Sequence, residues 1–328
     1  SGYVNGRIEE AQVLAAYTNI SRRLNWAVGV QQEPYFFYEG SSVDRVDAFE
    51  NVLTTDVRRI VLRSAFAQAA YPLSRFRRVE LGARATMVDD AILHLNEYYD
   101  PISGLYTREP EIDREGLSSA AYVQPSLAFV DDNSIFGFVG PMMGRRARFA
   151  IAPTFGGWNY TQITADYRRY DRLVGPFTLA SRALYFGRSG ADADRFSVFL
   201  GYPDILRGYT TGSFRRNECL NTAVDPGSVE LRFPLLTPLW DWVPTFLPPI
   251  EGALFYDAGV AWDSDSRVAF RNRREGESPM SVRTPLRSWG AAGRVNLFGI
   301  IILRFDYTKP IRRPGTSPFW TISLGPTF

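Results

Sequence analysis

Apolar and polar residues alternate with a period of two along most of this sequence. In residues 77–87, for example, apolar Val79 and Leu81 alternate with charged Arg78 and Glu80. Successive side chains of a β-strand leave opposite faces of a sheet, so this alternation predicts strands. Roughly thirteen segments have this pattern, near residues 11–19, 22–34, 54–68, 76–90, 118–131, 145–157, 160–170, 177–187, 228–236, 251–262, 287–298, 299–309 and 318–328.

No segment competes with these strands as an amphipathic or membrane-spanning helix. The longest apolar run is Phe298 to Leu303, far short of the roughly 18 residues that a spanning helix needs. A helical membrane protein is therefore excluded. A soluble β-rich protein and a membrane β-barrel remain.

The charge balance and the cysteine content exclude other classes. The chain has 37 basic and 35 acidic residues, so it lacks the basic excess typical of nucleic-acid binding. Cys219 is the single cysteine, which excludes a disulfide framework within the chain. The sequence begins at Ser1 without an export leader, so we expect any leader to have been removed or left out.

The two faces of the expected strands favour the membrane barrel. In a soluble sandwich the apolar face packs a dry core, whereas in a membrane barrel it faces lipid and the other face can be charged. The polar faces carry Arg78, Glu80, Arg84, Arg148, Asp166, Arg168, Arg182, Glu230, Arg232, Arg294, Arg304 and Asp306. Large aromatics occupy the apolar faces, many near strand ends as in an interfacial girdle: Trp26, Tyr167, Tyr185, Tyr256, Trp262, Trp289, Tyr307 and Trp320.

The connections differ in length, as they do in outer-membrane barrels. Short polar turns are expected at Gly156-Gly157 and at 309–313. Long irregular stretches are expected at 98–117, 188–227 and 263–285. Short turns at one end of a barrel and long loops at the other would fit this contrast.

The final segment ends on an apolar aromatic residue. Trp320, Ile322, Leu324 and Phe328 fall on one face of the expected last strand. Chain ends are normally polar and frayed in soluble proteins. This ending resembles the carboxy-terminal signal by which outer-membrane barrels are recognised during assembly.

An arginine and an aspartate stand out among the expected inner residues. In the segment 254–262, Asp257 lies opposite to Tyr256, so it faces the lumen if Tyr256 faces lipid. A half-buried carboxylate needs a partner, and an arginine offers two parallel hydrogen bonds. Arg207, in the long stretch 188–227, is the candidate.

The order of these motifs resembles the superfamily of outer-membrane protein insertases and two-partner secretion transporters, also called the bacterial surface antigen family. Its lid-loop motif is matched by Leu206-Arg207-Gly208-Tyr209, although leucine replaces the usual β-branched residue. Its F-x-D-x-G strand is matched by Phe255, Asp257 and Gly259. The resemblance implies that Arg207 contacts Asp257 inside the barrel.

Other segments extend the resemblance over residues 118–328 and more weakly over the earlier strands. The segments 229–235 and 302–311 add Glu230, Arg232, Arg304 and Asp306 as further candidates for the lumen. A strand connection resembling the family's D-N…P-x-x-G motif holds Asp132, Asn133, Pro141 and Gly144, with a longer spacing than usual.

The family implies a fold and its extent. It predicts an all-β, antiparallel transmembrane β-barrel of the outer-membrane type, with sixteen strands and a lid loop at about 188–227. Thirteen expected strands fall short of sixteen. We therefore expect residues 1–328 to be a barrel domain that is incomplete at its N-terminus, with one or more strands and a periplasmic portion before Ser1.

The family also implies a function in the bacterial outer membrane. The expected role is non-enzymatic insertion or assembly of outer-membrane proteins, or translocation of polypeptides, through a lateral seam. The expected partners are outer-membrane lipid, client polypeptides and periplasmic or upstream domains. A passive anchor or pore that displays an upstream soluble domain is the alternative.

Catalytic and metal-binding interpretations have little support in the sequence. His94 is the one histidine, and an ordinary strand histidine accounts for it. The pairs Asp89-Asp90 and Asp131-Asp132, and Asp263 with Asp265, resemble solvated turns more than divalent-cation sites. We expect no enzyme activity, no cofactor and no metal.

Overall fold

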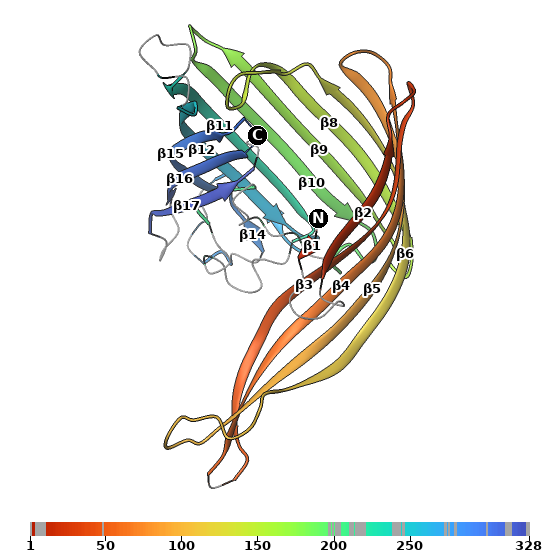
Figure 1. Cartoon of the computed structure of the whole chain (residues 1–328), viewed down its shortest axis with the longest axis vertical. Helices are drawn as coiled ribbons and strands as arrows, with labels where there is room; N and C mark the ends of the chain where they lie inside the picture. Colours follow the sequence, from red (N-terminus) through yellow and green to blue (C-terminus); the bar gives the residue numbers. More distant parts are fainter. Residues whose placement is uncertain are drawn as a thin grey trace. The chain divides into compact units, whose positions relative to one another are not determined.

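The structure of this chain is a computed structural model. It describes residues 2–3, 11–47, 49–195, 198, 200, 205–209, 213, 221–237, 244, 247–271, 274, 276–278, 281–299, 301–311 and 317–325. Every named element in these ranges is a β-strand (Figure 1). In the same ranges, no helix is long and apolar enough to cross a bilayer.

The chain divides into two compact units, which are described separately. Unit 1 comprises residues 1–71, 81–125 and 154–158, and unit 2 comprises residues 72–80, 126–153 and 159–328. Unit 1 contains β1 (Gly2–Tyr3), β2 (Gln12–Asn19), β3 (Asn25–Arg45), β4 (Asn51–Pro72) and most of β5 (Arg77–Tyr99) and β6 (Glu111–Asp132), paired in chain order.

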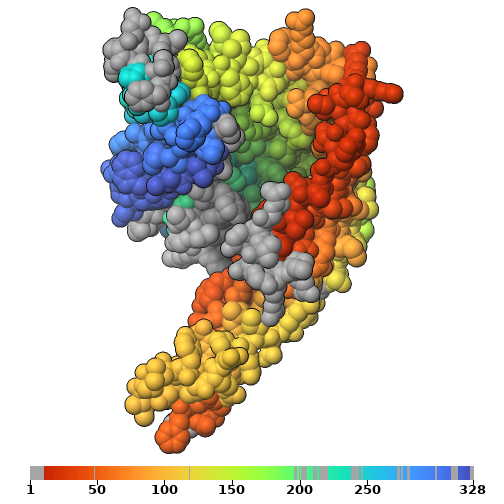
Figure 2. Space-filling model, viewed as in Figure 1, coloured from red at the N-terminus to blue at the C-terminus, as the bar shows by residue number. Residues whose placement is uncertain are grey.

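Strands β3 to β6 are much longer than a bilayer requires. They contain 21, 22, 23 and 22 residues, whereas a tilted strand crosses a membrane with about 9–11. Strand β2 pairs with β3 only between Trp26 and Gln32. The remaining parts of the four strands form a slender projection of unit 1, drawn in orange and yellow (Figure 2).

The projection is too acidic to lie in hydrocarbon. Residues 33–62 and 88–119 contain fourteen acidic and five basic side chains, a net charge of −9, whereas the whole chain carries +2. Ionised groups are costly in lipid. This part of unit 1 therefore lies in water.

Unit 2 is an antiparallel succession of eight strands with short additions. Its strands pair in chain order, and β7 (Ile135–Phe136) adds to the edge of β8 near the start of that strand. The parallel pair β13 (Arg267–Val268) and β14 (Val282–Arg283) lies within the connection 263–285. The main strands are β8 (Pro141–Gly156), β9 (Tyr160–Arg172), β10 (Thr178–Ser189), β11 (Ala223–Leu236), β12 (Ile250–Trp262), β15 (Leu286–Leu297), β16 (Ile301–Ile311) and β17 (Phe319–Leu324).

Each of the thirteen predicted segments overlaps one strand, β2 to β6, β8 to β12 or β15 to β17. The extents of the strands were predicted less well than their existence. The stretch 98–117 was expected to be irregular, but only residues 100–110 lie between β5 and β6. The long connection after β10 covers residues 190–222.

The expectation that short turns and long loops occupy opposite ends is wrong for both named turns. Thr161, near the start of β9, pairs with Ser189, where the connection 190–222 begins. Ile311, at the end of β16, pairs with Arg287, just after the connection 263–285. Both short turns thus lie at the same end of the sheet as the long connections. Strand direction alternates along the chain, so the position of a connection in the strand order sets the end at which it lies, whatever its length.

The apolar face of the strands is exposed and the charged face is buried, which is the opposite of the arrangement in soluble proteins. Trp26 of unit 1 is 39% exposed, and Tyr256 and Ile322 of unit 2 are 44% and 69% exposed. On the opposite face of unit 2, the charged Glu230 and Asp306 are completely buried. An apolar exterior and a charged interior exclude the dry-core sandwich and match a barrel in lipid.

The motif between β6 and β8 forms a compact local structure. The backbone N–H of Asn133 donates to the carbonyl of Arg145, and its side-chain oxygen accepts from the Arg145 N–H at 2.7 Å. Gly144 has a φ of 98°, and a Cβ atom there would lie 2.4 Å from the Asn133 carbonyl oxygen. Glycine is therefore the residue that permits this close approach.

Candidate functional site on the inner face of β11 to β16

The site is built on the strand register of unit 2. Because opposite residues in an antiparallel sheet share a face, the register fixes which side chains can meet. Ser228, Asp257 and Ser288 lie in one row across β11, β12 and β15. The next rows along the same face are Glu230, Phe255, Gly290 and Thr308, then Arg232, Ala253, Ala292 and Asp306, then Pro234, Glu251, Arg294 and Arg304.

Arg207 lies on these rows and contacts four side chains. Its Nε and Nη2 atoms each donate to an oxygen of the Asp257 carboxylate at 2.7 Å, a bidentate pair. Its Nη1 donates to Glu230 at 2.7 Å, and Nη2 also donates to Ser228 at 2.9 Å. The guanidinium lies over the ring of Phe255, 3.5 Å from the ring centroid.

Glu230 joins Arg207 to a wider ionic network. One Glu230 oxygen accepts from Arg207, and the other accepts from Arg294 at 2.6 Å and from Arg232 at 2.8 Å. Arg294 also donates to Glu251 at 3.0 Å. Arg304 and Asp306 form a further pair at 2.8 Å on β16. We call these eight residues the Arg207 cluster: Arg207, Glu230, Arg232, Glu251, Asp257, Arg294, Arg304 and Asp306.

The Arg207 cluster balances its charges away from water. It contains four arginines and four carboxylates, and Glu230 and Arg294 are completely buried. Burial disfavours the charged form of Arg207, but the Glu230 and Asp257 carboxylates raise the pKa of its guanidinium above the ordinary value. Arg207 is therefore charged at any physiological pH, and its removal would leave buried carboxylates without a counter-charge.

Gly208 fits where a larger residue would not. Its φ is 89°, in the left-handed region that favours glycine. A Cβ atom at this position would lie 2.7 Å from the Thr308 methyl group and 3.1 Å from the Ser288 Cβ. The Ser288 hydroxyl donates to the carbonyl oxygen of Arg207 at 2.7 Å, which brings the segment close to β15.

Tyr209 and Leu206 attach the same segment on both sides of Arg207. The Tyr209 hydroxyl donates to the Arg287 carbonyl oxygen at 2.7 Å and accepts from the Arg287 N–H at 3.2 Å. Leu206 is completely buried in an apolar cluster with Tyr209, Leu200 and Val224. The segment 205–209 thus combines ionic, hydrogen-bonded and apolar contacts.

The glycines near Phe255 make room for its ring and for the segment. Phe255 pairs with Gly290 across β12 and β15, and a Cβ atom on Gly290 would lie 2.6 Å from the Phe255 ring. A Cβ atom on Gly259 would lie 3.3 Å from a Leu200 methyl group. The spacing of Phe255, Asp257 and Gly259 therefore places an aromatic platform, a carboxylate and a gap on one face.

The structure brings most of the predicted site residues together. Arg207, Asp257, Glu230 and Arg232 share one network, while Arg304 and Asp306 lie on the same face. Trp320, Ile322 and Leu324 lie elsewhere, on the exposed face of β17. Phe328 and Cys219 fall outside the described residues.

Four contributors were absent from the predicted site: Ser228, Glu251, Ser288 and Arg294. Part of their signal was present: Ser228 and Glu251 share an alternating face with Glu230 and Asp257 on their own strands, and Ser288 shares one with Arg294 on β15. The register between strands, which the sequence does not contain, was needed to join them. Arg294 had been assigned to a polar face but not to the site.

The acidic pairs considered as cation sites are occupied by arginines. Asp90 accepts two hydrogen bonds from Arg58, and Asp131 pairs with Arg145 at 2.8 Å. Across the residues that the structure describes, no three His, Cys, Asp or Glu side chains are arranged to hold a metal ion. His94 contacts Asp56 at 2.7 Å on unit 1.

Comparison with known proteins identifies the family. The Omp85 superfamily domain matches residues 95–328, which is more than two thirds of the chain. The chain belongs to the Omp85 superfamily. A search of curated proteins finds no match. Among solved structures, BamA from Haemophilus ducreyi lacking POTRA domains 1–3 is similar, with 15% identity, a TM-score of 0.49, and coverage of 95% of this chain and 69% of that one.

Membership of the Omp85 superfamily, together with the strand pattern, gives the location of the chain. It is an all-β, antiparallel transmembrane barrel domain of the bacterial outer membrane. The superfamily serves protein insertion into, or translocation across, that membrane. The exposed apolar face is therefore the lipid-facing side, and the Arg207 cluster is on the inner side.

Proposed function

We propose that this Omp85 barrel assists the insertion and assembly of outer-membrane proteins, or the translocation of polypeptides, without catalysing a covalent reaction. In this proposal the segment at about 188–227 is a lid that Arg207 fastens to the inner wall. The observation that carries the proposal is the bidentate Arg207–Asp257 pair, reinforced by Glu230.

The contacts of the lid support a role in ordering the lumen. A segment held by ionic and hydrogen-bonded contacts to β11, β12 and β15 resists displacement, because each broken pair leaves a buried charge. An ordered lid would prevent a wide barrel from leaking. It would also keep the inner wall in one conformation while a client associates with the barrel.

The last strand supports a lateral seam. Strand β17 pairs with β16 over six residue positions, whereas β16 pairs with β15 over eleven. Among the described strands β17 has β16 as its one neighbour. An unpaired strand edge offers N–H and C=O groups to an incoming strand, so we propose that client strands pair at this edge.

The proposed partners follow from this mechanism. Outer-membrane lipid surrounds the apolar face, and unfolded client polypeptides approach the seam. Periplasmic or upstream domains would deliver those clients. Lid fastening and seam opening are separate steps, so they can be tested by separate variants.

The test replaces Arg207 in the full-length natural protein. Arg207→Ala should leave the barrel folded, because strand pairing does not depend on it, and should strongly reduce insertion of an unfolded outer-membrane barrel protein into liposomes. The control is Arg168→Ala, since Arg168 lies on β9, outside the strands that hold Arg207, and forms an inner-face ion pair with Asp166 at 2.7 Å.

The result can also contradict the proposal. Wild-type insertion by Arg207→Ala, with the lid contacts shown to be lost, would remove the assigned role of Arg207. If conductance through the barrel is normal and no client is inserted by either protein, the chain is a passive pore or anchor for an upstream domain.

A further inference from the structure

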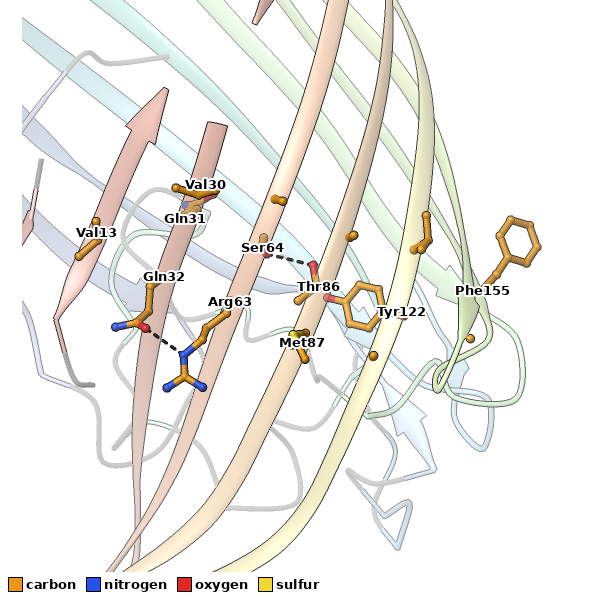
Figure 3. Close-up of a pocket in the computed structure, with 15 residues that line it drawn as sticks. Val13, Val30, Gln31, Gln32, Arg63, Ser64, Thr86, Met87, Tyr122 and Phe155 are labelled. Atoms are coloured by element: carbon orange, nitrogen blue, oxygen red, sulfur yellow. Dashed lines mark hydrogen bonds between the residues drawn. The ribbon is translucent and has the colours of Figure 1, made fainter. Parts of the chain in front are cut away.

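The lipid-facing side of unit 1 contains an open groove. Its volume is about 690 Å³, within the range of roughly 300–1,000 Å³ for small-molecule sites. The groove crosses β3 to β6 and reaches β8, and Figure 3 shows its lining residues. Apolar and small side chains of the exposed face line most of it: Val30, Ala65, Ala85, Met87, Val123 and Phe155.

A basic side chain lies at one edge of this groove. Arg63 is opposite Gln32 in the β3–β4 register, on the same face as Val30 and Ala65. Gln32 orients it: its Nε2 donates to the Ala11 carbonyl at 2.9 Å, and its Oε1 accepts from Arg63 Nε at 3.0 Å (Figure 3). Within the part of the chain that the structure describes, the terminal nitrogens of Arg63 donate no hydrogen bond.

Arg63 differs from other arginines on the exposed faces. The exposed Arg114 pairs with Asp89 at 2.7 Å in unit 1, and the exposed Arg169 pairs with Asp171 at 2.8 Å in unit 2. Within the described part of the chain, Arg63 forms no ion pair. An exposed guanidinium held by one amide can donate two parallel hydrogen bonds to a phosphate.

The position of Arg63 relative to the membrane indicates that its ligand is a lipid. Trp26 packs against Tyr17, with ring centroids 5.6 Å apart, as aromatic residues do at a membrane interface. From Trp26 to Gln32 is six residues, about 20 Å along the strand, which is less than the roughly 25 Å height of the apolar band of a barrel. Arg63 therefore faces acyl chains or the inner edge of the headgroups.

We propose that this groove binds one acyl chain of an anionic phospholipid, and that Arg63 binds the lipid phosphate. The small side chains of Ala65 and Ala85 leave space for the chain between Val30 and Met87. The lipid phosphate would supply the negatively charged partner that the described part of the chain does not give to Arg63. The ligand is a membrane lipid and not a soluble anion, because the groove is mostly apolar.

The test measures lipid retained by the purified full-length protein in a neutral detergent, using native mass spectrometry. The probes are phosphatidylglycerol, phosphatidylcholine with the same acyl chains, and inorganic phosphate. Wild type should prefer phosphatidylglycerol. Arg63→Gln should lower its affinity about tenfold, because a charge-assisted bidentate contact is lost, and Arg63→Lys should restore part of it.

Two further variants test the chain-binding part of the groove. Ala85→Phe should reduce retention of both lipids by filling the groove. The control variants are Arg169→Gln and Ala291→Phe, which change exposed positions of unit 2. Both controls should retain phosphatidylglycerol as wild type does, and circular dichroism checks that every variant is folded.

Several outcomes would overturn the proposal. Wild-type retention of phosphatidylglycerol by Arg63→Gln would remove the phosphate contact. Equal losses in Ala85→Phe and Ala291→Phe would show ordinary annular lipid instead of a site. Displacement of the lipid by inorganic phosphate would show an anion site without a bound chain.

Discussion

Both units use arginine–carboxylate pairs, but they place them in different surroundings. In unit 1, Arg114 pairs with Asp89 at 2.7 Å, and the two side chains are 49% and 26% exposed. In unit 2, Arg294 pairs with Glu230 at 2.6 Å, and both are completely buried. The lengths of the two pairs are similar, so distance alone does not indicate what a pair contributes.

Solvent accounts for the difference between the units. An exposed pair competes with water and salt and is worth about 0–1 kcal/mol. A buried pair loses its hydration when it forms, and removal of one partner typically costs about 3–5 kcal/mol. The projection of unit 1 therefore depends on its backbone pairing, whereas the Arg207 cluster of unit 2 depends on every one of its charges.

The largest expected effect tests the buried side of this comparison. Glu230→Gln removes the negative charge that Arg207, Arg232 and Arg294 share, and should lower the free energy of unfolding by about 3–5 kcal/mol. Thermal unfolding in detergent micelles, followed by circular dichroism, measures it. Glu80→Gln is the control, because Glu80 of unit 2 is more accessible and pairs with half-exposed arginines. Equal losses in both variants would contradict the comparison.

Gly208→Ala should have the second largest effect, about 1–3 kcal/mol. The added methyl group combines an unfavourable backbone conformation with contacts to Thr308 and Ser288. Gly175→Ala separates these causes, because Gly175 also has a positive φ, of 53°, but has nothing within 4 Å of its Cβ position. Thermal unfolding of both variants gives the packing part by difference. A smaller loss for Gly208→Ala than for Gly175→Ala would exclude tight packing of the segment.

Tyr209→Phe should cost less, about 1 kcal/mol, since one hydroxyl is lost and the buried ring remains. The hydroxyl bonds to both backbone groups of Arg287. Proteolysis of the native protein, analysed by mass spectrometry, should show faster cleavage within 188–227 and unchanged cleavage elsewhere. Unchanged cleavage of that segment would mean that the hydroxyl does not restrain it.

The sequence was sufficient to predict the strands where one face meets lipid. Only there must apolar residues recur at every second position, as at Trp26, Val28 and Val30. Beyond the membrane both faces are wet, so residues 88–99 lost the alternation although they continue β5. Their pairing comes from backbone hydrogen bonds, which leave no side-chain pattern.

The sequence predicted which residues lie on the inner face, but it did not predict most of the contacts between them. Alternation assigned Glu230, Arg232 and Asp306 to the inner face, and the family resemblance joined Arg207 to Asp257. That Glu230 of β11 also contacts Arg294 of β15 depends on a register spanning three strands. A shift of one residue would have moved each of these side chains to the lipid face.

The smallest expected effect tests the exposed side of the comparison. Arg114→Gln should change the free energy of unfolding by less than about 1 kcal/mol, because water replaces the lost contact with Asp89. The difference from wild type should vanish as added salt shortens the Debye length from about 10 Å at 0.1 M to about 3 Å at 1 M. The loss in Glu230→Gln should persist at high salt, since ions do not reach a buried network. Thermal unfolding of both variants at the two salt concentrations makes the measurement, and equal salt sensitivity would show that the Arg207 cluster is open to solvent.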